Sequence, residues 1–211
     1  MLAPLVPRGT ELDDWQGRDF ASIVAFRFLD TCLFRCPVPL HRDFEEVNLR
    51  FYVRRAVGSE VRRAVVFVRE IVPRAAVAAT ARVLYNEPYI ALPMRSRTGT
   101  DPLDVQVEWK RSGRWEGVQA RAGGPPTLPA EGSQEGFIAE HYWGYTRQRD
   151  GSTVEYQVAH PRWAVGQATS WSVNADLGDL YGPAFAPFLG KPVSVYLADG
   201  SPISVSFPRR L

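Results

Sequence analysis

An alternating segment between Val47 and Arg54 places the firmest constraint on the fold. Apolar side chains occupy every second position of this segment, and polar side chains, including Asn48, Arg50 and Tyr52, occupy the positions between them. Successive side chains of a β-strand point to opposite faces of a sheet, so this period of two predicts a strand with one apolar and one polar face. The chain must therefore form a sheet and cover at least its apolar side.

Similar patterns recur along the 211 residues and predict a β-rich protein. Apolar or alternating runs bounded by turn residues predict further strands at Ser22–Leu29, Arg63–Val72, Val105–Trp109, from Trp115 onward, Ile138–Thr146, Val154–His160, Val193–Ala198 and Ile203–Phe207. Turn signals separate three pairs of these strands, at Lys110–Arg114, Arg149–Ser152 and Asp199–Gly200. Asp-Gly suits the positive φ angles of tight turns, so we expect the last two to close hairpins.

Two stretches predict helices. Pro73–Tyr85 is rich in alanine and opens with a proline, which the first turn of a helix tolerates. Asn174–Tyr181 opens with an N-capping residue, and its pattern leaves open an extension to Leu189. Gly123–Ser133 is the longest irregular segment and suits either a solvated connector or a lid over a pocket. Strand patterns continue on both sides of it, so we expect one domain over residues 1–211.

The net charge and the length of the apolar runs argue against nucleic-acid and membrane partners. The formal net charge is +2 and no long basic run is present, so a nucleic-acid partner is not expected. The longest apolar runs, such as Ala64–Val68, are too short to span a membrane, and the N-terminus lacks the pattern of a secretory signal. We expect a cytoplasmic protein without membrane contact. Whether it forms a homo-oligomer stays open.

The cysteines and histidines point to no metal and no cofactor. Cys32 and Cys36 would lie about 13 Å apart in an extended segment, too far for a disulfide unless a turn brings them closer. A cytoplasmic location also favours reduced thiols. The histidines, His41, His141 and His160, lack the spacing of a recognised zinc motif.

Several longer motifs resemble one protein family. They are Val6–Gly9, His41–Val53, Val68–Pro73, Ala81–Tyr89, Glu140–Tyr145 and Ala198–Pro202. Together they are similar to the YqjF-like proteins, a bacterial family of uncharacterised function, which is similar in fold to acetoacetate decarboxylase. The resemblance implies an α+β, mainly antiparallel β fold in which a curved, barrel-like sheet encloses a pocket and carries a few short helices.

The resemblance also implies that a catalytic lysine is missing. The decarboxylase forms a Schiff base through a lysine in a Gly-x-Pro-Lys-Lys segment, and the matching stretch, Asn86–Ile90, has Tyr89 in that place. A phenol cannot form an imine. The chain's two lysines, Lys110 and Lys191, are expected in a solvated turn and a solvated loop. We therefore expect no amine-dependent decarboxylation.

A candidate site combines the polar strand face with the end of the first predicted helix. The resemblance matches Phe44–Glu46 to a stretch that carries a pocket glutamate, so Glu46 is the candidate acid or base. The candidate substrate-binding residues are Arg27, Asn48, Arg50, Tyr52, Arg82, Glu87 and Tyr89. Arginines beside a carboxylate and a phenol suit a small anionic ligand. The alternative is a solvent-facing sheet surface, on which Arg50 and Arg82 pair with Glu46 and Glu87.

Three functions are compatible with these residues, since a fold does not fix a function. The first is an enzyme that acts on a small carboxylate or keto compound without a Schiff-base lysine. The second is a non-catalytic protein that binds a small ligand, and the third is an interaction module with a vestigial pocket. The sequence leaves open whether the protein is an enzyme.

Overall fold

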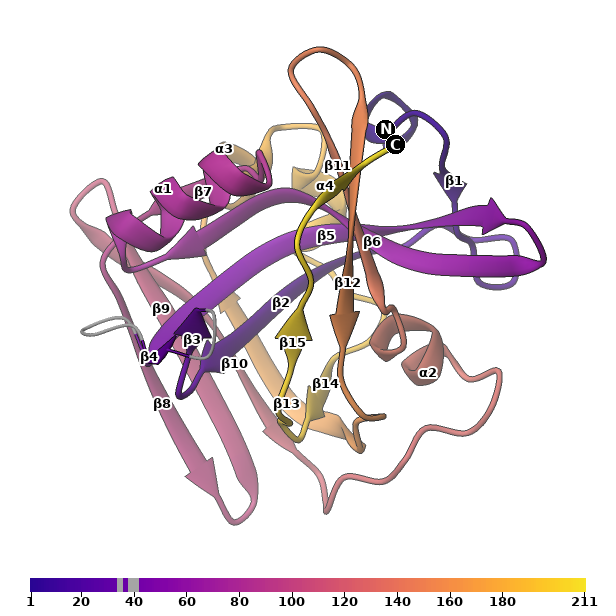
Figure 1. Cartoon of the computed structure of the whole chain (residues 1–211). Helices are drawn as coiled ribbons and strands as arrows, with labels where there is room; N and C mark the ends of the chain where they lie inside the picture. The colour runs from indigo at the N-terminus through magenta and orange to yellow at the C-terminus, as the bar shows by residue number, and fades with distance from the viewer. Residues whose placement is uncertain (34–35, 38–41) are drawn as a thin grey trace.

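The larger of two facing β-sheets carries the predicted two-faced strand (Figure 1). The computed structural model describes residues 1–33, 36–37 and 42–211. The strands of this sheet in the described part are β1 (Glu11–Leu12), β2 (Ala21–Phe28), β5 (Phe44–Val57), β6 (Glu60–Val72), β7 (Tyr89–Ala91), β11 (Trp143–Arg147), β12 (Thr153–Ala159), β15 (Ser204–Val205) and β16 (Arg209–Arg210). Their order is β1-β5-β6-β11-β12-β15, while β2, β7 and β16 pair with β5, β6 and β12.

The smaller sheet has the order β14-β13-β10-β9-β8. Its strands are β8 (Met94–Thr100), β9 (Leu103–Arg111), β10 (Arg114–Ala122), β13 (Val165–Asn174) and β14 (Tyr196–Ala198). A separate ladder joins β3 (Cys32–Leu33) and β4 (Cys36–Pro37). The described helices are η1 (Ala3–Leu5), α1 (Ala75–Leu84), α2 (Gln134–Ala139), α3 (Leu177–Tyr181) and α4 (Ala186–Leu189).

The apolar face of β5 forms the core between the two sheets. Val47, Leu49, Phe51 and Val53 have no exposed surface, and they belong to one buried cluster with Trp109 of β9. Full burial of such a side chain stabilises the fold by about 1.5–3 kcal/mol. A register slip of one residue would turn the whole apolar set away from the core, so this burial also fixes the register of β5.

The polar face of β5 is covered as well, by α1 at the start of the strand and by α2 farther along it (Figure 1). Phe44 packs against Ala78 of α1, and Tyr52 packs against Phe137 of α2. Asn48, which lies between these two positions, is 1% exposed, and so is Tyr52. The alternative of a solvent-facing polar surface is therefore wrong for these positions.

One predicted strand boundary and one predicted hairpin need correction. Ile138 belongs to α2, so the strand predicted at Ile138–Thr146 begins only at Trp143. The turn at Asp199–Gly200 does not close a hairpin, because β14 pairs with β13 of the smaller sheet and β15 pairs with β12 of the larger one. Strands β8 and β13 were not predicted, since neither has a sustained apolar alternation.

The second predicted helix is also shorter than its pattern. Asn174 is the last residue of β13, and Asp176 caps α3 instead by accepting a hydrogen bond from the Asp179 backbone N–H. The predicted extension to Leu189 is interrupted at Gly182, whose φ of 106° ends α3 before α4 begins.

The fold is α+β with mainly antiparallel sheets, as predicted, although β7 and β11 pair with β6 in parallel. Among the described strands the larger sheet keeps an open order and does not close into a barrel. None of the described helices has the length and apolar character needed to cross a membrane. Cys32 is a free, exposed cysteine. The side chain of Cys36, like all of His41, lies outside the described residues.

Candidate functional site

Three buried glutamates meet on the polar face of the larger sheet. Glu46 lies on β5, Glu70 on β6 and Glu87 just before β7, and they are 2%, 1% and 5% exposed. The strand register aligns them, because Asn48 lies opposite Glu70 and Glu70 lies opposite Tyr89. We refer to these three glutamates as the carboxyl cluster.

Two hydrogen bonds hold Glu46 in place. The Asn48 side-chain amide donates to Oε1 over 3.0 Å, and the Tyr89 hydroxyl donates to Oε2 over 2.9 Å. Tyr89 reaches this position because α1 ends at Leu84 and Asn86 adopts a φ of 58°, after which β7 returns along β6. The residue in the expected place of the Schiff-base lysine thus contacts the candidate acid or base directly.

Glu87 is held by hydrogen bonds from residues of β11 and β12. The hydroxyls of Thr146 on β11 and Tyr156 on β12 both donate to Glu87 Oε1, the latter over 2.7 Å. Tyr156 is buried, and burial beside the negative charge of Glu87 raises the pKa of its phenol well above the usual range. The cluster is therefore surrounded by neutral hydroxyl donors.

Burial raises the pKa of every carboxyl in the cluster. It raises the pKa of Glu46 to about 7, against the hydrogen bonds from Asn48 and Tyr89 and the charge of Arg50. Burial also raises the pKa of Glu87 to about 7, with a further contribution from Glu46. Burial and the charges of both neighbours raise the pKa of Glu70 well above its usual range. Near neutral pH the cluster therefore holds a carboxylate and a carboxylic acid side by side.

Gly144 makes room for the ring of Tyr156. The two residues lie opposite each other on β11 and β12, and a Cβ atom at Gly144 would lie 2.2 Å from Tyr156 Cζ. No real Cβ contact is that short, so the absence of a side chain at Gly144 lets the phenol reach Glu87.

Gly144→Ala is expected to destabilise the protein by about 1–3 kcal/mol, because the buried ring of Tyr156 must move. Urea denaturation measures the change. Gly124→Ala is the control, since a Cβ there would meet nothing within 4 Å. In a Tyr156→Leu background the penalty of Gly144→Ala should largely vanish. Equal penalties in both backgrounds would show that the ring is not the obstacle.

Three buried polar atoms beside the cluster lack a hydrogen-bond partner among the described residues. They are Asn48 Oδ1, Arg50 Nε and Glu70 Oε2. Asn48 and Glu70 are register partners, and Arg50 is the next residue of β5 on the same face. An unsatisfied buried polar atom lowers the free energy of unfolding by about 1–3 kcal/mol. Their adjacency marks a place that a ligand or an ordered water would satisfy.

The far end of the polar face contacts α2 rather than the cluster. The Tyr52 hydroxyl donates to Ser22 Oγ over 2.7 Å, and the Tyr52 ring lies 4.5 Å from that of His141 between centroids. Arg50 Nη2 donates to the Ile138 carbonyl over 3.3 Å. Tyr52 is therefore separated from Glu46, and Arg50 lies between the two ends.

His141 and Asp13 form a second buried polar group at that end. His141 Nε2 lies 3.4 Å from Asp13 Oδ2, which accepts a 2.7 Å hydrogen bond from Arg63 Nε. Burial lowers the pKa of His141 to about 4, so its ring is neutral at neutral pH. Asp13 keeps its charge, because the neighbouring His141 and Arg63 lower its pKa in spite of burial.

The structure brings five of the eight predicted site residues together, while Tyr52 lies at the far end of the polar face and two arginines lie away from it. Glu46, Asn48, Glu87 and Tyr89 converge, with Arg50 beside them. Arg27 and Arg82 are exposed, which corrects the expectation that both contribute to one pocket. Arg27 lies opposite Glu45 on the other face of the sheet, and Arg82 lies in the last turn of α1. The predicted ion pairs of Arg50 and Arg82 are not among those of the described residues.

Glu70, Thr146 and Tyr156 were not predicted as site residues. Glu70 follows Arg69 in the otherwise apolar stretch Ala64–Val72, and an acidic residue in such a stretch was the available signal. Thr146 and Tyr156 carry no such signal, since they reach the cluster only through the pairing of β11 with β12. Lys110 and Lys191 are both exposed, as predicted.

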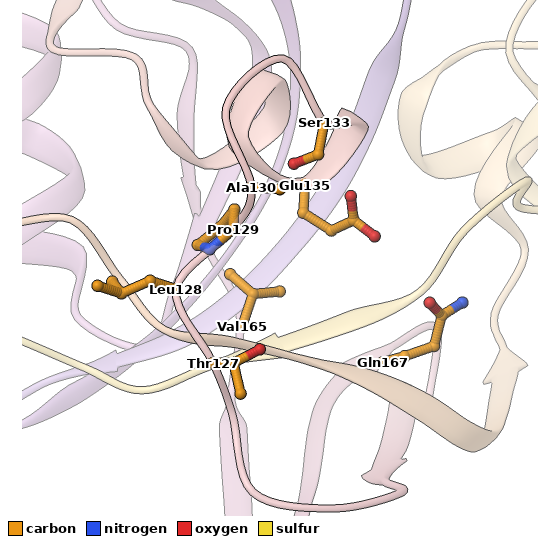
Figure 2. Close-up of a pocket in the computed structure, with 8 residues that line it drawn as sticks. All are labelled: Thr127, Leu128, Pro129, Ala130, Ser133, Glu135, Val165 and Gln167. Atoms are coloured by element: carbon orange, nitrogen blue, oxygen red, sulfur yellow. The ribbon is translucent and has the colours of Figure 1, made fainter.

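Two cavities in the described part of the chain lie away from the carboxyl cluster. One, of about 380 Å³, lies between α2, β13 and the Gly123–Ser133 segment, and Glu135 and Gln167 project into it (Figure 2). The other, of about 260 Å³, is lined by Arg8 and Arg55 among others. The irregular segment is thus the wall of a separate cavity. Within the described residues no group of His, Cys, Asp or Glu side chains is placed to hold a metal ion.

The arrangement of sheets and helices is that of the acetoacetate decarboxylase-like proteins. An acetoacetate decarboxylase from Legionella pneumophila superposes with a TM-score of 0.65 at 13% identity, over 100% of this chain and 79% of that one. An acetoacetate decarboxylase-like enzyme from Sphingomonas wittichii superposes with a TM-score of 0.57 at 13% identity, over 99% of this chain and 82% of that one. The third structure is the enduracididine biosynthesis enzyme MppR, complexed with the condensation product of pyruvate and imidazole 4-carboxaldehyde. It superposes with a TM-score of 0.50 at 13% identity, over 82% of this chain and 70% of that one.

The chain belongs to the family DUF2071, described as an uncharacterized conserved protein, whose model matches residues 1–202. No curated protein matches it in sequence. The expected membership in an uncharacterised family with the acetoacetate decarboxylase fold is confirmed.

Proposed function

We propose that the protein is an enzyme that moves a proton on a small keto compound bound at the polar face, without a Schiff base. The observation that carries the proposal is the contact between Glu46, Tyr89 and Glu70 in one buried cluster. Paired carboxyl groups in different protonation states supply a base and an acid within one site. The names of two similar structures support the substrate class, since one refers to acetoacetate and another to a product of pyruvate.

Each carboxyl has a distinct part in this proposal. The ionised carboxylate of Glu46 takes a proton from the carbon next to the carbonyl, and the electrons of that C–H bond pass to the carbonyl oxygen to give an enolate. Protonated Glu70, whose Oε2 is unpaired among the described residues, donates a hydrogen bond to the enolate oxygen. Protonated Glu46 then exchanges its proton for one from solvent, and return of that proton to the carbon restores the keto compound and completes the exchange. Asn48 and Tyr89 keep Glu46 oriented.

The primary test is exchange of the methyl protons of pyruvate in D₂O, followed by NMR. The wild-type protein is expected to accelerate exchange over buffer, and sodium borohydride added with pyruvate is expected to leave its mass unchanged. An imine on a side chain would require Lys110 or Lys191, which are both exposed. A stoichiometric borohydride adduct at either lysine would overturn the mechanism. Binding of pyruvate without exchange would instead indicate a ligand-binding protein.

A further inference from the structure

Arg50 differs from two other half-buried arginines of the larger sheet. Arg62 pairs with Glu155 and Arg63 pairs with Asp13, over 3.1 and 2.7 Å. Arg50 forms no ion pair within the described part of the chain, and its Nε is buried without a hydrogen-bond partner. Its hydrogen bond to a backbone carbonyl of α2 supplies no counter-charge, and its charge acts on the Glu46 carboxyl only through space. A guanidinium withdrawn from water in this way favours an anion as its partner.

The position of Arg50 couples it to the carboxyl cluster. Arg50 lies on the same strand face as Glu46, and its positive charge stabilises the ionised form of that carboxyl. Asn48, between them on β5, presents an unpaired Oδ1. An anion that pairs with Arg50 would therefore sit beside the cluster, where ionised carboxylates repel it.

We propose that Arg50 binds the carboxylate of a small anionic ligand, and that binding is accompanied by uptake of a proton by the carboxyl cluster. The proposal rests on the polar face being the ligand site, and it adds the group that recognises the substrate. The added negative charge cancels the influence of Arg50 on Glu46 and makes the protonated form of the cluster more favourable. Ligand binding and proton binding then reinforce each other, as linkage requires.

Other titratable groups near Arg50 do not account for such an uptake near pH 7. The pKa of His141 is lowered to about 4 by burial, and the pKa of Asp13 is lowered as well, so neither gains a proton at neutral pH. Tyr89 and Tyr156 are already protonated, because burial raises the pKa of both phenols. Arg63 is charged and paired with Asp13. Glu70 is already protonated, because its pKa is raised well above the usual range, so the proton must go to Glu46 or Glu87.

Calorimetric titration with pyruvate at pH 7 tests the proposal, in two buffers of different ionisation enthalpy. The difference in apparent enthalpy gives the number of protons taken up, which is expected to be a clear fraction of one per pyruvate bound. Affinity is expected to fall several-fold between pH 6 and pH 8. Pyruvamide, which lacks the negative charge, is expected to bind more weakly and with no uptake.

Three variants test whether the positive charge of Arg50 recognises the carboxylate of pyruvate. Arg50→Gln should weaken pyruvate binding at least tenfold and abolish its preference over pyruvamide, while Arg50→Lys should keep part of both. Arg82→Gln, an exposed arginine outside the site, should behave as wild type. Thermal unfolding verifies that each variant is folded.

Three outcomes would overturn the proposal: pyruvate binding without proton uptake, unchanged binding by Arg50→Gln, or no pyruvate binding at millimolar concentrations. The proposed proton transfer would survive any of these if pyruvamide protons still exchanged and Glu46→Gln abolished that exchange. Loss of exchange with both compounds would count against the proposed function itself.

Discussion

Glu46→Gln is expected to lower the rate of pyruvate proton exchange by about 10²–10⁴-fold, the usual contribution of a general base. The amide keeps the size of the side chain and an oxygen that accepts the hydrogen bond from Tyr89, but it cannot take a proton. The rate is measured by NMR in D₂O over a range of pH. Wild-type activity should rise with pH through about 7, because burial raises the pKa of Glu46 to that value and only the ionised form acts as the base.

The neighbouring residue provides a matched control for this variant. Glu45 lies on the opposite face of β5, where its carboxylate accepts a 2.8 Å hydrogen bond from Ser96. Glu45→Gln is therefore expected to exchange protons within a few-fold of the wild-type rate. A Glu46→Gln protein that is folded and retains half the wild-type rate would remove Glu46 from the mechanism, and loss of activity only in Glu45→Gln would reverse the assignment.

The free energy of unfolding is expected to fall as the pH rises from 6 to 8.5. A carboxyl whose pKa is raised in the folded state binds its proton more tightly there than in the unfolded chain. Its contribution to stability is complete below the unfolded pKa and is lost as the pH rises through the folded pKa. Glu46 and Glu87, each with a pKa of about 7, would then each lose on the order of 1 kcal/mol of stability, roughly 2–3 kcal/mol together.

Urea denaturation at several pH values measures this loss. Glu87→Gln should reduce the slope of stability against pH, since one titrating carboxyl is gone, and its amide oxygen can still accept the hydrogen bond from Tyr156. Glu45→Gln should leave the slope unchanged. If stability is constant or rises between pH 6 and 8.5, the cluster is not protonated in the folded protein and the acid–base assignment fails with it.

The candidate site was only partly predictable, and the reason lies in how its members meet. Glu46, Asn48 and Tyr89 follow from a strand pattern and a family resemblance, both of which are local in sequence. Glu70 joins them because β5 and β6 pair with a register shift between Leu49 and Arg50, which no sequence period reveals. Arg27 and Arg82 were misplaced because a pattern of residue types does not show which arginines are buried.

The sequence by itself determined that β5 has two chemically distinct faces and that a phenol replaces the expected lysine. The alternation of apolar and polar side chains in β5 is a local property of eight residues, and burial of the apolar face follows from the hydrophobic effect alone. Only the tertiary structure decided that the polar face is buried too. That outcome depends on α1 and α2, which come from distant parts of the chain and cover the strand near Phe44 and near Tyr52 (Figure 1). Removal from water is what raises the carboxyl pKa values, so the chemistry of the cluster is a consequence of packing and not of residue order.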